Sequence, residues 1–263
     1  MLVAGASSSM DWWDEEFCRA LAAGDATSGP RRVLRYDLRD TGQSETVPPG
    51  AAEYTGNELL GDLAALIEHA DAAPAHVVGL SLGGGLVQQL ALRRPELLAT
   101  ITLMSTTPGG PGSALAASLP PPTPELMQSF ASEPKPVDET DPDAVGDSFV
   151  EMERLFSGSI PVDEVRIRRI AAAAAARTRS LRSAESHWSL ADGPGARSDL
   201  DSITLPTLVI HGAQDPLFPL AHGERLAGVI PGARLVVVPG MGHQNPPPPS
   251  WPQIVGELLR HTA

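Results

Sequence analysis

The stretch Gly79-Leu80-Ser81-Leu82-Gly83 decides the fold of this chain of 263 residues. It follows the apolar pair Val77-Val78 and leads into a helix that starts with two more glycines, Gly84 and Gly85. Glycines two residues on either side of a serine let the backbone turn sharply from strand to helix without Cβ clashes. Such a turn projects the Ser81 hydroxyl above the edge of a sheet, where it can act as a nucleophile. The alternative is a serine that merely caps an ordinary helix.

The regions around this turn alternate between short apolar runs and amphipathic patterns. Strands are predicted at residues 2–3, 32–36, 76–80, 100–104, 205–210 and 234–238. Helices with an apolar stripe are predicted at residues 12–23, 57–70, 82–94 and 251–261. The strand runs are apolar rather than alternating, which is typical of a parallel sheet covered by helices on both faces. The sequence therefore predicts an α/β fold with a mostly parallel sheet.

Residues 107–204 break this rhythm with helical patterns at 125–132, 144–156 and 163–188. We therefore expect a first core part at residues 1–106, a helical cap insertion at 107–204 and a second core part at 205–263. A cap that follows the carboxyl end of a strand would act as a lid over the sheet edge, and a helical decoration without gating is the alternative. Its arginines are expected on a solvated face: Arg166, Arg168, Arg169, Arg177, Arg179 and Arg182. Its large apolar side chains are pocket walls or, more commonly, packing: Leu126, Met127, Phe130, Phe149, Met152, Leu155, Phe156 and Trp188.

A serine hydroxyl needs a base to become a nucleophile, and histidine is the usual one. The chain has seven histidines: His69, His76, His187, His211, His222, His243 and His261. His243 ends the run Pro239-Gly240-Met241-Gly242-His243 directly after the last predicted strand, and two glycines there allow a turn over the sheet edge. We therefore predict His243 as the base. His187, beside Trp188 at the end of the cap, is a second candidate for contact with a substrate, and both residues are predicted pocket contacts.

The base in turn needs a carboxylate that fixes its tautomer. Asp215 follows the strand that ends at Ile210, whereas the segment after Met104 offers Ser105-Thr106-Thr107 and no carboxylate. The alternative for Asp215 is an aspartate that caps a turn before proline. Two backbone N–H groups should hold the oxyanion, and we expect them from Leu82, after the nucleophile, and Ala6, in the loop after the first strand.

Composition narrows the classes of partner. The chain carries 32 acidic and 19 basic residues, a net charge of −13, and such a surface repels nucleic acid and anionic membranes. A single cysteine, Cys18, excludes an internal disulfide and a cysteine metal cluster. No basic leader or long apolar run is visible. We therefore expect a cytoplasmic protein with a small-molecule substrate and no nucleic-acid or membrane partner.

These motifs together resemble the α/β-hydrolase family and, within it, the aclacinomycin methylesterase group of polyketide-tailoring serine esterases. The resemblance is carried by residues 13–17 with Leu21, 35–44, 76–83, 205–210, 215–216 and 239–243. It covers residues 1–106 and 201–263, and it implies that Ser81, Asp215 and His243 form the triad and that Ala6 and Leu82 are the oxyanion donors. Leu82 stands where the methylesterases have methionine, and Ala6 where they have glycine. Both differences change the pocket wall but not the backbone donors.

The same resemblance points to a missing element at the front. Family members carry a two-stranded hairpin before the strand that here starts at Met1, and it covers the edge formed by residues 32–36. An uncovered Val33-Leu34 edge would pair with another chain, so the sequence predicts a homodimer through this edge. A trimmed or displaced chain start explains the absence equally well.

The resulting hypothesis is a serine carboxylic-ester hydrolase that forms an acyl-enzyme on a small or medium apolar ester and needs no metal or organic cofactor. Three alternatives stay open. A proline iminopeptidase-like aminopeptidase would grip a free amine with acidic groups of the cap, for which the candidates are Glu125, Glu151, Glu153 and Asp163. A cofactor-free perhydrolase would use the same triad with peroxide. The third is a non-catalytic ligand-binding member.

Overall fold

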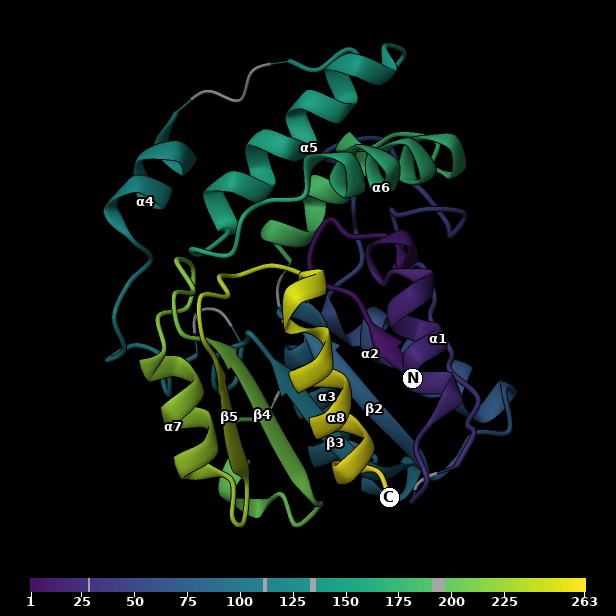
Figure 1. The fold of residues 1–263 in the computed structure, drawn as a ribbon, viewed down its shortest axis with the longest axis vertical. Coiled ribbons are helices and arrows are strands. Elements are labelled where there is room, and N and C mark those ends of the chain that lie inside the picture. Colours follow the sequence, from purple (N-terminus) through teal and green to yellow (C-terminus); the bar gives the residue numbers. More distant parts are fainter. Residues whose placement is uncertain (28, 111–112, 133–135, 191–196) are drawn as a thin grey trace.

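A five-stranded parallel sheet forms the centre of the molecule in a computed structural model (Figure 1). The structure describes residues 1–263 except 28, 111–112, 133–135 and 191–196. The strands lie side by side in chain order: β1 (Leu2–Val3), β2 (Ala75–Leu80), β3 (Leu98–Met104), β4 (Thr207–Gly212) and β5 (Arg234–Val238). Each neighbouring pair is parallel, in agreement with the apolar strand runs of the sequence.

Helices cover both faces of the sheet (Figure 1). One face carries α1 (Glu15–Ala23) and α8 (Trp251–His261), and the other carries α2 (Gly56–His69), α3 (Leu82–Arg93) and α7 (Ala221–Val229). Successive strand residues point to opposite faces, so Val77 packs with the α2–α3 side and Val78 with the α1–α8 side. The two apolar layers hold the strands rigidly, which fixes the positions of the loops at their carboxyl ends.

The strand predicted at residues 32–36 is wrong. This segment makes a single parallel bridge, between Leu2 and Arg35, and the N–H of Leu2 donates to the carbonyl oxygen of Leu34 at 2.8 Å. Because β1 has only two residues, it offers too short a partner for a ladder to continue. The Arg32 side chain instead donates to the carbonyl oxygen of Ala70. Edge pairing with a second copy stays a prediction.

The cap lies beyond the carboxyl ends of the strands (Figure 1). Between β3 and β4 the described residues form α4 (Pro124–Ala131), α5 (Pro142–Phe156), α6 (Glu164–Arg177) and the 3-10 helix η3 (Arg182–Trp188). Three short stretches of the expected insertion, 111–112, 133–135 and 191–196, lie outside the described residues. No helix in the described ranges is both long and apolar enough to span a bilayer.

The long cap helix predicted at residues 163–188 is two elements. Asp163 caps its start by accepting from the N–H of Arg166 at 3.0 Å, as an N-cap aspartate should. The α-helix ends at Arg177, and Thr178 after it is extended, with φ −91° and ψ 154°. The carboxylate of Glu139 then accepts from the N–H groups of Leu181 and Arg182, at 2.9 and 3.1 Å. These two bonds start η3 in a new direction.

Arginine side chains of α6 join the cap to the core, which corrects the expectation of a solvated face for Arg166 and Arg177. The Arg166 guanidinium, 6% exposed, lies 2.6 Å from the Asp14 carboxylate, which is 4% exposed. Arg169 contacts the same carboxylate at 2.9 Å. Arg177 pairs with Asp11 and Asp37 of the core. Of the six arginines expected on a solvated face, the other four are exposed, namely Arg168, Arg169, Arg179 and Arg182, and Arg168 pairs there with Asp147.

Replacing Arg166 tests how firmly the cap is held. We expect Arg166→Ala to lower the free energy of unfolding by about 3 kcal/mol, because the buried Asp14 carboxylate then keeps, among the described residues, the exposed Arg169 as its ion-pair partner. Arg168→Ala is the matched control on the same helix, and its exposed ion pair should contribute at most about 1 kcal/mol. Urea unfolding of both variants makes the measurement. Equal losses would contradict the structural role of the buried pair.

Candidate active site

The turn at Ser81 has the strained geometry that the flanking glycines predict. Ser81 sits between the end of β2 and the start of α3 with φ +51° and ψ −113°, a conformation that side chains rarely adopt. A Cβ on Gly83 would lie 2.6 Å from the carbonyl oxygen of Val3 and 2.7 Å from that of Ala4. A Cβ on Gly79 would collide with the carbonyl of Gly83. Glycine at position 83 therefore lets α3 start directly against β1, and glycine at position 79 lets the first turn of α3 pack against the end of β2.

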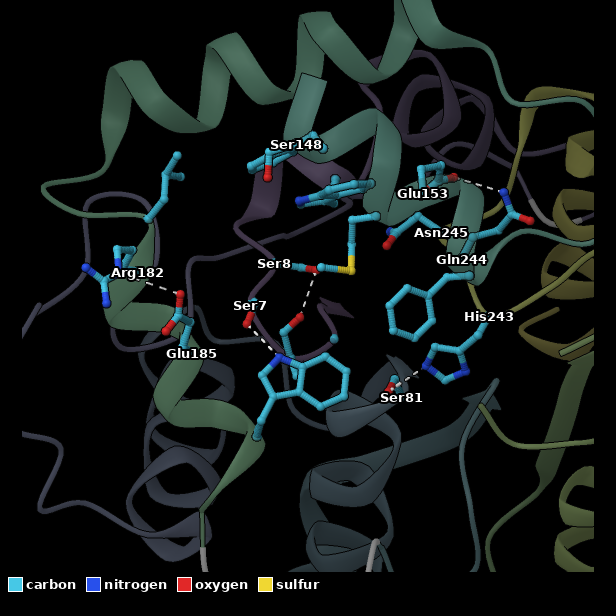
Figure 2. Close-up of a pocket in the computed structure, with 18 of the residues that line it drawn as sticks. Ser7, Ser8, Ser81, Ser148, Glu153, Arg182, Glu185, His243, Gln244 and Asn245 are labelled. Atoms are coloured by element: carbon cyan, nitrogen blue, oxygen red, sulfur yellow. Dashed lines mark hydrogen bonds and ion pairs between the residues drawn. The ribbon is translucent and has the colours of Figure 1, made fainter. Parts of the chain in front are cut away.

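The three side chains singled out in the sequence meet at this edge. The Ser81 Oγ lies 3.0 Å from Nε2 of His243, and the Nδ1 of His243 lies 2.9 Å from Oδ2 of Asp215 (Figure 2 shows the first of these contacts). The residues come from the ends of β2, β4 and β5, far apart in the chain. Their contacts form one continuous path from hydroxyl to carboxylate.

Asp215 is held rigidly and kept ionised. Its side chain is fully buried, and Oδ1 accepts from the N–H groups of Leu217 and Phe218 at 2.9 and 2.7 Å. Burial by itself would raise the pKa of Asp215, but the attraction of His243 and the hydrogen bonds outweigh it, so the pKa is lowered. The second oxygen is thereby left free to bind the imidazole in one orientation.

His211 lies behind this carboxylate as a packing residue, as its place at the end of a strand suggests. It is 0% exposed, and its Nε2 donates to the carbonyl oxygen of Phe218 at 2.7 Å. Burial lowers the pKa of His211 and keeps the ring neutral. It therefore supports the turn that carries Asp215.

The His243 loop is braced by the cap. The N–H of His243 donates to the carbonyl oxygen of Phe156, the last residue of α5, at 2.7 Å. The Phe156 ring lies 5.8 Å from the imidazole between centroids, and the Phe218 ring lies 5.3 Å from it on an edge. The next residue, Gln244, donates from Nε2 to the buried carboxylate of Glu153 at 2.9 Å. Burial raises the pKa of Glu153.

The two expected oxyanion donors flank the serine. Gly5 lies against Ser81, because a Cβ on it would be 3.4 Å from the Ser81 Cβ, and Ala6 follows it into the cavity wall. Leu82 is the first residue of α3, where backbone N–H groups have no partner within the helix. The next N–H in the loop, that of Ser7, donates to Nδ1 of His187 at 3.1 Å. Ser7 therefore does not compete with Ala6 for the same role.

A cavity of about 280 Å³ opens above these residues, between core and cap (Figure 2). Ser81 and His243 lie at one end, and Arg182 and Glu185 lie at the other. Apolar side chains form much of the wall between the ends: Trp12, Val145, Phe149, Met152, Phe156 and Trp188. Four of the cap's predicted apolar residues, Phe149, Met152, Phe156 and Trp188, are thus wall, whereas Leu126 is buried packing.

Two sequence expectations for the cap need refinement. Trp188 lines the cavity as predicted, but His187 lies behind the wall, 5% exposed, with its ring bonded to the backbone of the core. Of the four acidic residues proposed to grip an amine, Glu153 lines the cavity. Asp163 caps α6, and Glu125 and Glu151 point to solvent.

Comparison with known proteins agrees with this geometry. The family model described as the alpha/beta hydrolase fold matches residues 2–245. The chain belongs to the α/β-hydrolase family. Rhodomycin D methylesterase DnrP of Streptomyces peucetius is 34% identical over 263 residues, which cover 94% of this chain and 85% of that protein.

Solved structures of other hydrolases share the fold. The esterase RhEst1 from Rhodococcus sp. ECU1013 has a TM-score of 0.72 at 19% identity, with 99% of this chain and 88% of that chain covered. The enol-lactonase from Burkholderia xenovorans LB400 has a TM-score of 0.67 at 22% identity, with 99% and 89% covered. At such identities these likenesses establish the hydrolase fold alone.

Sequence reasoning missed several cavity residues of this hydrolase. Gln244 and Asn245 line the cavity directly after His243, and their adjacency to the predicted base was the available signal. Glu139 also lines it, from a cap segment between α4 and α5. No pattern in the chain marks Glu139, because its place depends on how η3 docks.

Gly83→Ala tests the close approach on which the turn depends. We expect it to lower the free energy of unfolding by about 1–3 kcal/mol, because the added methyl overlaps the carbonyl oxygens of Val3 and Ala4. Gly85→Ala is the matched control, since a Cβ at Gly85 in α3 meets no atom within 4 Å and alanine favours a helix by up to about 1 kcal/mol. Urea unfolding followed by circular dichroism compares the two. A neutral Gly83→Ala would show that the turn is not sterically fixed.

Proposed function

We propose that this α/β hydrolase is a serine carboxylic-ester hydrolase with Ser81, His243 and Asp215 as its triad. The observation that carries the proposal is the path of two hydrogen-bond distances, 3.0 Å from Ser81 to His243 and 2.9 Å from His243 to Asp215. Both lie within the range in which a base can take a proton from a nucleophile. A buried carboxylate at the far end is what a neutral imidazole needs to act as that base.

The reaction follows from these contacts. Ser81 Oγ attacks the ester carbonyl carbon while its proton passes to Nε2 of His243, and Asp215 stabilises the resulting imidazolium. The N–H groups of Ala6 and Leu82 bind the oxyanion. Collapse expels the alcohol, which takes the proton from His243, and leaves an acyl group on Ser81. Water then gives a proton to His243 and attacks the acyl carbon. When this second intermediate collapses, the bond to Ser81 Oγ breaks, His243 returns the proton to Oγ, and the carboxylic acid is released.

The cavity indicates the class of ester. Its volume of about 280 Å³ and its aromatic and aliphatic walls suit an apolar acyl body of small or medium size. The open end with Arg182 and Glu185 leaves room for a polar substituent away from the triad. A relative that is named as a methylesterase supports a small alcohol as the leaving group. We therefore propose a methyl or similarly small alkyl ester of an apolar acid of small or medium size.

Replacing the nucleophile tests the function directly. We expect Ser81→Ala to abolish turnover of p-nitrophenyl acetate and labelling by a fluorophosphonate, because no other group takes the place of the hydroxyl. Ser202→Ala, at an exposed serine in the 3-10 helix before β4, is the matched control and should keep full rates and labelling. Turnover of Ser81→Ala near the unchanged level would refute the assignment. Unlabelled wild-type protein would point to a non-catalytic ligand-binding member.

A substrate comparison separates the remaining chemistries. We expect p-nitrophenyl esters to be turned over far faster than prolyl p-nitroanilide, because Glu153 is the one proposed amine-binding acid in the cavity and Gln244 already occupies one of its oxygens. A preference for the prolyl amide would favour the aminopeptidase. Halide oxidation that needs acetate and peroxide would favour the perhydrolase. A series of acyl chain lengths then measures how much of the cavity the substrate fills.

A further inference from the structure

The loop that carries Ala6 is strained and is held from the cap. Ser7, the next residue, has φ +56°, where glycine is the usual residue of a turn. The turn is closed by the N–H of Ser8, which donates to the carbonyl oxygen of Gly5 at 3.3 Å. Three contacts from η3 hold Ser7: its N–H donates to His187, its Oγ donates to the carbonyl oxygen of Ala184 at 2.8 Å, and its Oγ accepts from Nε1 of Trp188 at 3.0 Å.

His187 makes the contact that bears on the backbone. Its Nδ1 lies 3.1 Å from the N–H of Ser7, so Nδ1 must be the unprotonated nitrogen that accepts. The proton is then on Nε2, which donates to the carbonyl oxygen of Arg39 at 2.8 Å. Burial lowers the pKa of His187 and so favours this neutral form. The ring therefore joins the loop after β1 to the segment at Arg39.

This contact fixes the direction of a peptide group. The N–H of Ser7 and the carbonyl of Ala6 belong to one planar unit, so holding the N–H also orients the carbonyl of Ala6. With the turn closed from Gly5 to Ser8, little freedom is left for the N–H of Ala6. That N–H lies in the loop beside Ser81, where Gly5 makes the close approach.

We propose that His187 is a positioning residue for the oxyanion hole: by accepting from the N–H of Ser7, it aims the N–H of Ala6 at the charge that develops on the substrate. The proposal rests on the ester hydrolysis proposed above, because the oxyanion exists only in acyl transfer. His187 itself does not touch the substrate. It acts on the transition state more than on the bound ester, since the charge on the carbonyl oxygen develops only there.

The docking of η3 does not depend on this ring alone. The Ser183 Oγ donates to the carbonyl oxygen of Val47 at 2.6 Å, and the Ser186 Oγ donates to the carboxylate of Asp40 at 3.0 Å. These contacts place the 3-10 helix against the core through other residues. A variant at position 187 should therefore keep the cap in place and release the N–H of Ser7 in the oxyanion loop, residues 5–8.

Two substitutions at this position differ in the acceptor. His187→Leu has no acceptor, and we expect it to lower kcat by up to about 10²-fold with KM within a few-fold, as for the loss of one oxyanion donor. His187→Asn puts Oδ1 where Nδ1 stands, so it should recover most of kcat. Rates on a p-nitrophenyl ester are expressed per active site, titrated with a fluorophosphonate. If His187→Leu does not fold, His187→Gln replaces it. The glutamine amide lies further from Cα than the Nδ1 of histidine, so this variant also has no acceptor at the position of Nδ1.

A transition-state analogue separates positioning from general packing. A trifluoromethyl ketone forms a charged hemiketal on Ser81, so its affinity should fall in His187→Leu by the same factor as kcat/KM and recover in His187→Asn. His261→Leu is the matched control: His261 also binds a backbone carbonyl, that of Ile101, at 3.0 Å and has a pKa lowered by burial, but it lies at the end of α8. It should keep the unchanged kcat and inhibitor affinity.

The outcomes are distinct. Unchanged kcat in His187→Leu, unchanged inhibitor affinity, or an asparagine variant as impaired as the leucine variant would each overturn the positioning role. All three leave the esterase assignment intact, because that assignment is tested separately, by turnover and labelling of Ser81→Ala and by the substrate comparison. A parallel loss of kcat and inhibitor affinity that asparagine restores supports the proposal.

Discussion

The close backbone contact at the start of α3 is the constraint on which the rest of the site depends. Without a side chain on Gly83, the first turn of the helix rests on the carbonyl oxygens of Val3 and Ala4. That contact puts the end of β1 beside the end of β2, and so Ala6 beside Ser81. The proposed nucleophile and the proposed oxyanion donor come from separate parts of the chain, and the absence of a Cβ on Gly83 lets them lie close together.

The cap does more than cover the cavity, because it also holds the loops that carry His243 and Ala6. The end of α5 binds the backbone of the His243 loop through Phe156, and η3 holds the oxyanion loop through Ser7. Its own position is fixed by the buried pair of Arg166 and Asp14 and by the contacts of Arg177 with the core. The loop of His243 and the loop of Ala6 are therefore both bonded to the same insertion. A change in the position of the cap would alter the geometry of both loops.

The sequence could predict the site residues because each follows a strand that local patterns reveal. Ser81, Asp215 and His243 come after apolar runs, and the carboxyl ends of parallel strands share one edge, so their convergence could be expected before the distances were known. The strand at 32–36 was predicted on the same local basis and was wrong, because a ladder also needs a partner of sufficient length and β1 has two residues. The roles of the α6 arginines were missed for a related reason: charge and periodicity do not say which acids of the core will face a helix.

The amino-acid sequence by itself determined the α/β fold, the chain order of the candidate residues Ser81, Asp215 and His243, and the sharp turn at Ser81, since these depend on residue type and on spacing along the chain. The tertiary structure alone decided that His187 lies behind the oxyanion loop rather than in the pocket, that Glu153 reaches Gln244, and that Arg166 is buried. Those three contacts join residues 91 to 180 positions apart. Their geometry follows from how the cap docks on the core. Docking depends on the fit between two surfaces, and local patterns in the sequence do not determine that fit.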